Sequence, residues 1–433
     1  ADLGFTFSDA VATVLDGMPP LEGARGQGRV AIPETGPGRF DISLTEGRTT
    51  PPGGGAISLD GSSFAIADVA APVPVGEVAL RGDGALADVL ALIDRPPLRL
   101  ISKLGADLGA VGGRGAGTTR IRLPLLKDLD IADVSVSSSA DLTDVSLVVP
   151  GLGLPASARR AVLTVDETRL TLEAEAVVEG QRVNVAWQEV FSPPAGAAPT
   201  ELDLSGAVGA RALARLGLDA LRLDDGAGWA RAKVAIPRAG PAALSAELSF
   251  DKAALSIPAI GWRKSAGDKA RVSLAGSVGG GVLELTRLKA AAPGLALDGR
   301  LSADLAGGGL RGARLTRVLL DGVAEGAVDY RAEAGVANIR FDGPFLDFAA
   351  LLDAADAAPD AEASDAPGGP MRIDLRADRL TVAEGIVLHG AQAEATRDCA
   401  ERLDHLAVGG GRRGRCAARS GPVRGRARRG ADP

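Results

Sequence analysis

Apolar and polar residues alternate with a period of two through most of the chain, which places the apolar side chains on one face of a β-strand. Residues 170–178 show this alternation, and it resumes at 183–187 after the turn Glu179-Gly180-Gln181. These two segments predict a β-hairpin. Further segments with the same alternation are 244–250, 272–276, 283–285, 295–301 and 371–375. The pattern predicts a meander of antiparallel strands with one apolar face and one polar face.

Short helical patterns interrupt the strands at three places. Residues 85–94, 209–219 and 345–353 are amphipathic, with apolar residues three and four positions apart. Each follows a strand that we expect to end at a glycine, and these glycines are Gly82, Gly206 and Gly343. We interpret the recurrence as a weak internal repeat, in which one large sheet is punctuated by about three short amphipathic helices.

Changes in composition mark the expected organisation of the chain. Residues 1–353 form the predicted repeating body, and the acidic Ala/Pro-rich segment 354–370 is expected to be a disordered loop. Strands of the body continue over 371–395. The Arg-rich tail 396–433 interrupts a running strand pattern, so we interpret it as an out-of-frame reading and assign it no function. A disordered tail, or a basic tail that binds anionic lipid or nucleic acid, are the alternatives.

The composition contains few side chains that carry chemistry. Apolar residues make up 46% of the chain, aromatic residues only 3%, and there are two His and two Cys. Because no cluster of His, Cys or carboxylates is visible, we expect no catalytic, metal or cofactor site, and no enzyme. Both cysteines lie in the tail, and a body without cysteine is compatible with an oxidising compartment. No signal peptide or long apolar run occurs, and we interpret the chain as a fragment that lacks its own N-terminus.

Several single features have a plainer interpretation than the functional one. Trp187, Trp229 and Trp262 could mark a membrane-facing rim, but aromatic residues that cap a hydrophobic core are the simpler expectation. The cluster Gly112–Gly115 lacks the Lys-Ser/Thr of a phosphate-binding loop, so turn glycines are expected. His389 is expected at the surface.

Acidic residues near the expected helix ends could bind a cation. They are Asp94, Asp224 and Asp225. Carboxylates in a solvated turn are the simpler interpretation.

Several segments resemble a known family. Gly115–Lys127 (GAGTTRIRLPLLK), Asp130–Leu147 and Val165–Trp187 resemble the large AsmA-like C-terminal region of YhdP-type bacterial envelope proteins. Met18–Gly23 and Met371–Gly390 also look like recurring elements of this family. The resemblance covers roughly residues 1–395 and consists of structural patterns, so it carries no active-site residue with it.

The resemblance implies a fold and a role. It implies an elongated, twisted antiparallel β-sheet curled into a U-shaped groove with an apolar inside. Proteins of this kind are anchored in the inner membrane, extend across the periplasm and are implicated in moving phospholipid toward the outer membrane. The implied partners are phospholipid acyl chains, the inner membrane through an N-terminal anchor missing from this chain, and outer-membrane components, with no nucleic acid.

Three short helices cannot cover the apolar face of so many strands. That face must pack on a second sheet, close on itself or be filled by acyl chains, which gain about 0.8 kcal/mol per buried CH₂. From the residues alone a sandwich core and an open groove are nearly equal, and the resemblance favours the groove. The candidate lining residues are Leu170, Leu172, Val183, Val185, Leu244, Leu248, Phe250, Val272, Leu274, Leu283 and Leu285.

Two other functions compete with lipid conduction. The first is an envelope scaffold or assembly factor without lipid flux, as suggested for the related TamB-like branch. The second is a secreted repetitive β-protein. A β-solenoid of that kind should show Asn ladders, and the only asparagines are Asn184 and Asn338.

Overall fold

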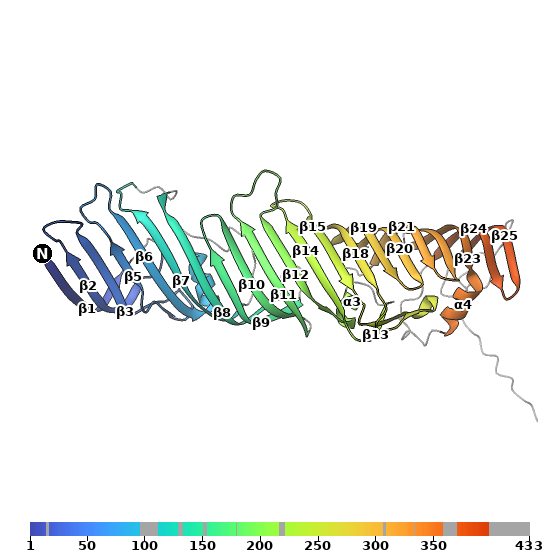
Figure 1. Ribbon diagram of the computed structural model, residues 1–433, viewed down its shortest axis with the longest axis horizontal. Coiled ribbons are helices and arrows are strands. Elements are labelled where there is room, and N and C mark those ends of the chain that lie inside the picture. Colours follow the sequence, from blue (N-terminus) through green and yellow to red (C-terminus); the bar gives the residue numbers. More distant parts are fainter. Residues whose placement is uncertain are drawn as a thin grey trace, which may run out of the picture. The chain divides into compact units, whose positions relative to one another are not determined.

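The protein is mainly β, as its alternation predicts. The computed structural model describes residues 1–13, 17–95, 111–128, 133–149, 154–178, 180–215, 221–305, 309–333, 335–357 and 370–397 (Figure 1). Twenty-two of the strands belong to one large sheet, and three α-helices lie in these ranges. The chain divides into two units, residues 1–255 with 265–283 (unit 1) and residues 256–264 with 284–433 (unit 2). The expectation of one large sheet with about three short helices is confirmed.

Unit 1 contributes fifteen strands that follow one another in chain order. Figure 1 shows them from blue to yellow, and β1 lies at the edge. They are β1 (Asp2–Ala12), β2 (Leu21–Ala31), β3 (Arg39–Thr49), β4 (Ile57–Ser58), β5 (Ser63–Ile66), β6 (Val75–Ala85), β7 (Gly112–Pro124), β8 (Ser135–Val149), β9 (Leu154–Val165), β10 (Arg169–Val178), β11 (Gln181–Val190), β12 (Thr200–Val208), β14 (Gly228–Ile236), β15 (Ala242–Ser249) and β18 (Arg271–Gly279). These strands pair with one another in antiparallel orientation.

Two short strands occupy a single position in the sheet of unit 1. Both β4 and β5 pair antiparallel with β3 on one side and with β6 on the other. They are therefore one strand interrupted at residues 59–62. The hydroxyl of Ser62, which is 2% exposed, accepts a hydrogen bond from the Arg81 amide at 3.0 Å and fills the gap in the ladder.

The predicted hairpin is present as β10 and β11. All ten residues of each strand are paired, from Arg169 opposite Val190 to Val178 opposite Gln181. Gly180 in the turn has a φ of 77°, a left-handed conformation that favours glycine.

Unit 2 contains six strands of the large sheet, and two of these six form a parallel pair. The strands are β20 (Leu295–Asp304), β21 (Gly309–Leu320), β22 (Ala324–Glu333), β23 (Val336–Asp347), β24 (Met371–Ala383) and β25 (Ile386–Arg397), with β25 at the edge. The pairs from β20 to β23 and the pair β24–β25 are antiparallel, but β23 and β24 are parallel. The sheet is therefore mixed, and the expectation of an antiparallel sheet is wrong for this pair. Parallel neighbours need a crossover connection, and α4 (Phe348–Ala357) lies in the connection between β23 and β24.

Some elements belong to both units or to a smaller sheet. The strand β19 (Val282–Ala292) contains the boundary between the units. Three shorter strands form a separate sheet, namely β13 (Arg222–Asp225), β16 (Ala254–Ile257) and β17 (Trp262–Lys264). The 3₁₀ helix η2 (Pro258–Ile260) lies between the last two and packs against α4.

The helices begin later than the sequence pattern suggests, because the strands run past the glycines. The first two are α1 (Leu86–Ile93) and α3 (Ala210–Arg215). The strand before α4 continues through Gly343 to Asp347, whose carboxylate accepts a hydrogen bond from the Ala350 amide at 2.9 Å. This cap starts α4 at Phe348 rather than at residue 345.

The glycine expected to end β23 instead has a packing role. A Cβ on Gly343 would lie 2.2 Å from the carbonyl oxygen of Glu325 on the next strand. Glycine is therefore required by the close approach of two strands, and the strand does not end there.

The predicted disordered loop and tail fall mostly on residues that the structure does not describe. The helix α4 extends to Ala357, so the first four residues of the predicted loop 354–370 are helical. Residues 358–369 and 398–433 lie outside the described residues, and with them almost all of the Arg-rich tail.

Candidate functional site

The apolar positions of unit 1 join into continuous rows across the sheet. A row here is a set of residues that lie directly opposite one another on neighbouring strands. The central row runs through Leu163, Leu172, Trp187, Leu202, Val234 and Leu244, from β9 to β15. Since the side chains of one row lie on one face, the strands share a single apolar surface.

Two further rows run beside the central one and reach β18. The first contains Ala161, Ala174, Val185, Leu204, Ala232, Ala246 and Leu274. The second contains Ala158, Ala176, Val183, Gly206, Ala230, Leu248 and Val272. These three rows are called the apolar face of unit 1. They hold no charged residue, which makes this face a candidate surface for apolar ligands.

The apolar face of unit 1 is closed at one end. There α1 places Leu86 against Leu142 of β8 and Ala161 of β9, and the three side chains are 6%, 7% and 3% exposed. Leu90 and Leu172 pack against the same cluster. A Cβ on Gly115 of β7 would lie 3.7 Å from a methyl group of Leu86, so the glycine allows the helix to approach the sheet.

Across β11 to β18 most residues of the same rows are only partly buried, although Gly206 is buried. Val185, Leu204, Leu244 and Leu274 all retain part of their surface to solvent. Neighbouring strands lie about 4.8 Å apart, so adjacent side chains of one row shield one another in part. The apolar face of unit 1 is therefore open there, and it could accommodate an extended hydrocarbon chain.

Most of the candidate lining residues fall on this face. Leu172, Val183, Val185, Leu244, Leu248, Val272 and Leu274 belong to the three rows. Leu170 lies on the same phase of β10, opposite Val165 and Glu189 at the margin. Leu283 is half-buried in β19. The structure thus brings together eight of the residues selected by their alternation.

Two candidates are part of a core instead. Phe250 is 2% exposed and Leu285 is 5% exposed, so neither offers surface to a ligand. The ring of Phe250 lies over Gly228, where a Cβ would come within 2.5 Å of it. Aromatic rings commonly pack over glycines in this way, because the missing side chain leaves a gap in the sheet.

Sequence reasoning missed the contribution of β14. Its residues Ala230, Ala232 and Val234 complete all three rows between β12 and β15. The signal was present, since Arg231 and Lys233 alternate with them and point to the polar face. Alanine is a weak marker of an apolar face, and the pattern was therefore easy to overlook.

The three tryptophans differ in their surroundings. Trp262 is 6% exposed and its Nε1 donates a hydrogen bond to the Pro293 carbonyl at 2.9 Å, so it is a core residue. Trp229 is 51% exposed and lies on the polar phase of β14. Trp187 lies in the central apolar row, and its buried Nε1 has no hydrogen-bond partner. They do not form one rim.

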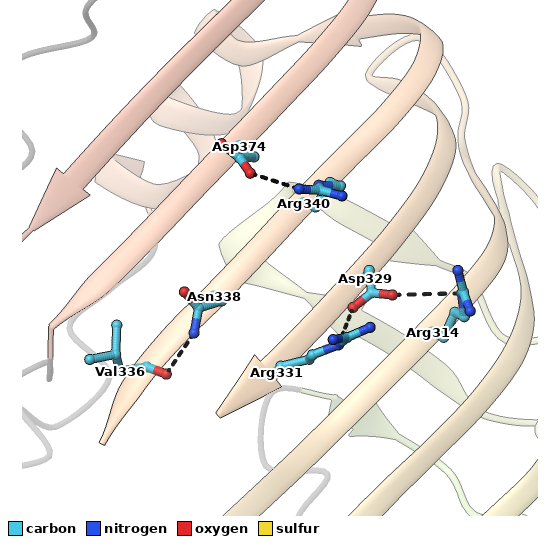
Figure 2. Close-up of polar contacts among 7 residues, drawn as sticks. All are labelled: Arg314, Asp329, Arg331, Val336, Asn338, Arg340 and Asp374. Atoms are coloured by element: carbon cyan, nitrogen blue, oxygen red, sulfur yellow. Dashed lines mark hydrogen bonds and ion pairs between the residues drawn. The ribbon is translucent and has the colours of Figure 1, made fainter. Parts of the chain in front are cut away.

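The opposite face carries charged side chains in register. In unit 1 the ammonium group of Lys233 lies 3.2 Å from a carboxylate oxygen of Asp203, and the guanidinium of Arg160 donates to Asp141 at 2.8 Å. In unit 2 the Nε atoms of Arg314 and Arg331 lie 3.6 and 3.0 Å from the two carboxylate oxygens of Asp329 (Figure 2). Such exposed pairs keep the polar face wet and contribute little to stability.

The remaining polar features are ordinary structural ones. Gly112–Gly115 begin β7 and are strand residues, and His389 is exposed on β25. Asp94 follows the last turn of α1, and Asp225 accepts a hydrogen bond from the Gly226 amide.

Hydrogen bonds shift the pKa of two exposed carboxyls. The guanidinium of Arg29 donates to Asp2 and lowers the pKa of that carboxyl below its usual value. The hydroxyl and amide of Thr168 lower the pKa of Asp166 in the turn between β9 and β10. Both groups stabilise local structure at the surface.

Within the described ranges no group of three His, Cys, Asp or Glu could hold a metal ion. No helix of the described residues is both long and apolar enough to cross a bilayer. No family model, no curated protein and no solved structure matches the chain.

Proposed function

We propose that this chain belongs to a bacterial envelope protein that holds phospholipid acyl chains along an apolar β-groove between the inner and outer membranes. The observation that carries the proposal is the apolar face of unit 1, which is continuous over seven strands and half-exposed across β11 to β18. The resemblance to AsmA-like, YhdP-type proteins supports the cellular setting, the periplasm.

The energetics of the open face favour a hydrocarbon ligand. Each methylene group that leaves water gains about 0.8 kcal/mol, so a chain of ten methylenes has about 8 kcal/mol available before entropic costs. Apart from Trp187, the lining is made of Leu, Val, Ala and Gly, which offer no directional polar contact. Such a surface binds the acyl chain and leaves the headgroup free, as a conduit for several lipids requires.

The proposal is tested by lipid that copurifies with the protein. We would secrete residues 1–397 to a bacterial periplasm, purify them without detergent and analyse extracted lipid by mass spectrometry. Phospholipid is expected with the parent chain and should be lost when Leu172, Val185 and Leu248 are changed together to Asp, because charges in the rows exclude hydrocarbon.

The control places two of the same charges on the opposite face. Ala186→Asp and Ser245→Asp change exposed residues of the polar phases of β11 and β15 and should leave the bound lipid unchanged. A folded parent chain that carries no phospholipid would refute the proposal and favour an envelope scaffold. If the control variants also lose their lipid, the lipid is not bound specifically at the apolar face of unit 1.

A further inference from the structure

We propose that the polar face of unit 2 binds a phosphate-type oxyanion at Arg331, Asn338 and Arg372, which are directly opposite one another on β22, β23 and β24. On the other face of the same strands Tyr330, Ile339 and Ile373 are opposite one another. The site does not rest on the proposed lipid function. Two neighbouring rows of polar residues on these strands differ in their balance of charge.

The first of these rows neutralises itself. Arg314, Asp329, Arg340 and Asp374 follow one another across four strands with alternating charge. Asp329 is bridged by Arg314, and Arg340 donates to Asp374 at 3.1 Å. Figure 2 shows these pairs side by side along the sheet. A row with this alternation has no charge left for a ligand.

The second row contains hydrogen-bond donors and no carboxylate. Gly312, Arg331, Asn338, Arg372 and Thr396 are opposite one another from β21 to β25. Within the described residues Arg372 makes no hydrogen bond or ion pair. Arg331 reaches sideways to Asp329, which it shares with Arg314. The row therefore carries two positive charges that only one shared carboxylate offsets.

The two arginines face a common hollow. Arg331, Asn338 and Arg372 line a depression of about 700 Å³ together with the first row. Across two strand spacings the backbones of Arg331 and Arg372 lie about 10 Å apart, and the short Asn338 between them leaves room for a small ligand. Guanidinium groups bind phosphate oxygens through paired N–H donors, so two arginines on either side of the gap suit an oxyanion.

Four carboxylates line the hollow together with four arginines, and they belong to Asp329, Glu333, Asp342 and Asp374. Asp329 and Asp374 are held by Arg314 and Arg340. Asp342 is directly opposite Arg376. Glu333 lies at the end of β22, two residues beyond Arg331. The positive charge of Arg372 is thus the least compensated in the hollow.

Solvent exposure sets the expected strength of this site. The side chain of Arg331 is 62% exposed and Arg372 is also exposed, so water and salt screen their charges. One phosphate ion should bind weakly. A surface that carries many phosphate groups should bind more strongly, because a second contact is then intramolecular.

The first experiment is a titration of the full chain with inorganic phosphate, followed by NMR of the arginine Nε–H groups. Signals of Arg331 and Arg372 should shift with saturation. Arg331→Gln and Arg372→Gln should each weaken binding at least fivefold, whereas Arg317→Gln, an exposed arginine of β21 outside the hollow, should leave binding unchanged. Asp329→Asn should tighten binding, because it releases Arg331.

The second experiment separates free phosphate from a lipid headgroup. Sedimentation with vesicles of neutral phosphatidylcholine, with and without 30% phosphatidylglycerol, measures binding to a phosphate-rich anionic surface. Saturable binding of phosphate or of anionic vesicles that depends on Arg331 and Arg372 supports the site. The assay in which binding occurs shows whether the ligand is free phosphate or a lipid headgroup. No binding in either assay, or binding that both glutamine variants retain, overturns the proposal.

Discussion

The apolar face of unit 1 is closed beneath α1 and open across β11 to β18, although the same rows run through both regions. Beneath α1 the side chains of Leu142 and Ala161 are almost completely buried. Farther along the rows, Val185 and Leu204 are only partly buried. One pattern of alternation thus lies in a core beneath α1 and at a more exposed surface farther along the sheet.

The largest difference in the free energy of unfolding should appear between variants of leucines in the two regions. Leu86→Ala should destabilise the protein by about 2–5 kcal/mol, because it removes a buried side chain and leaves a cavity under α1. Leu244→Ala on the open face should cost about 1 kcal/mol or less, since part of that side chain already contacts water. Urea unfolding of the two variants measures both values. Equal losses would contradict the division into closed and open regions.

A second test concerns the backbone beneath the open region. Gly206→Ala should cost about 1–3 kcal/mol, because its Cβ would lie 2.3 Å from the Arg182 carbonyl oxygen. Gly82→Ala is the control, since no atom lies within 4 Å of its Cβ position. Thermal unfolding of the pair should separate them. A neutral Gly206→Ala would show that β11 and β12 are not packed as closely as described.

Two tryptophans should respond differently to the same substitution. Trp262→Phe removes a buried hydrogen bond to Pro293 and should cost about 1–2 kcal/mol. Trp187→Phe removes a buried N–H that has no partner, so it should be neutral or slightly stabilising. Chemical denaturation of both variants gives the comparison. A large loss for Trp187→Phe would mean that its indole N–H is satisfied.

The smallest effect on stability is expected when the pH is lowered. The pKa of Asp166 is lowered by its hydrogen bonds to Thr168, so its contribution is present above the unfolded-state pKa of about 4 and is lost as pH falls through the lower folded value. Asp166→Asn should remove that pH dependence from the β9–β10 turn. Protection factors of the Thr168 and Arg169 amides at pH 3 and pH 6, each corrected for the intrinsic exchange rate at that pH, report the change. Identical protection factors at both pH values would contradict the assignment.

The sequence was most informative where alternation was strong. Residues 170–187 predicted both strands of the β10–β11 hairpin, its turn and its apolar face, because Leu and Val alternate there with Glu and Arg. The parallel pair β23–β24 could not be predicted in this way. Alternation gives the faces of a strand and not its direction, and the crossover is a property of α4 and the connection beside it.

The candidate lining was predicted only in part, for a related reason. Alternation placed Leu172 and Leu248 on the correct face, yet it could not show that Phe250 is buried over Gly228. Burial depends on what packs above the sheet, which involves residues distant in the chain. The polar row of Arg331, Asn338 and Arg372 was invisible for the same reason, since only the register of three strands brings these residues together.

The most direct test of the central claim is site-specific photocrosslinking in cells. A photoreactive phenylalanine analogue at Leu244 lies on the open apolar face, and the same residue at Ser245 lies on the polar face one position away. After irradiation, mass spectrometry should detect phospholipid adducts at position 244 and none at position 245. Absence of adducts at 244, or equal adducts at both positions, would contradict an open apolar face that holds lipid.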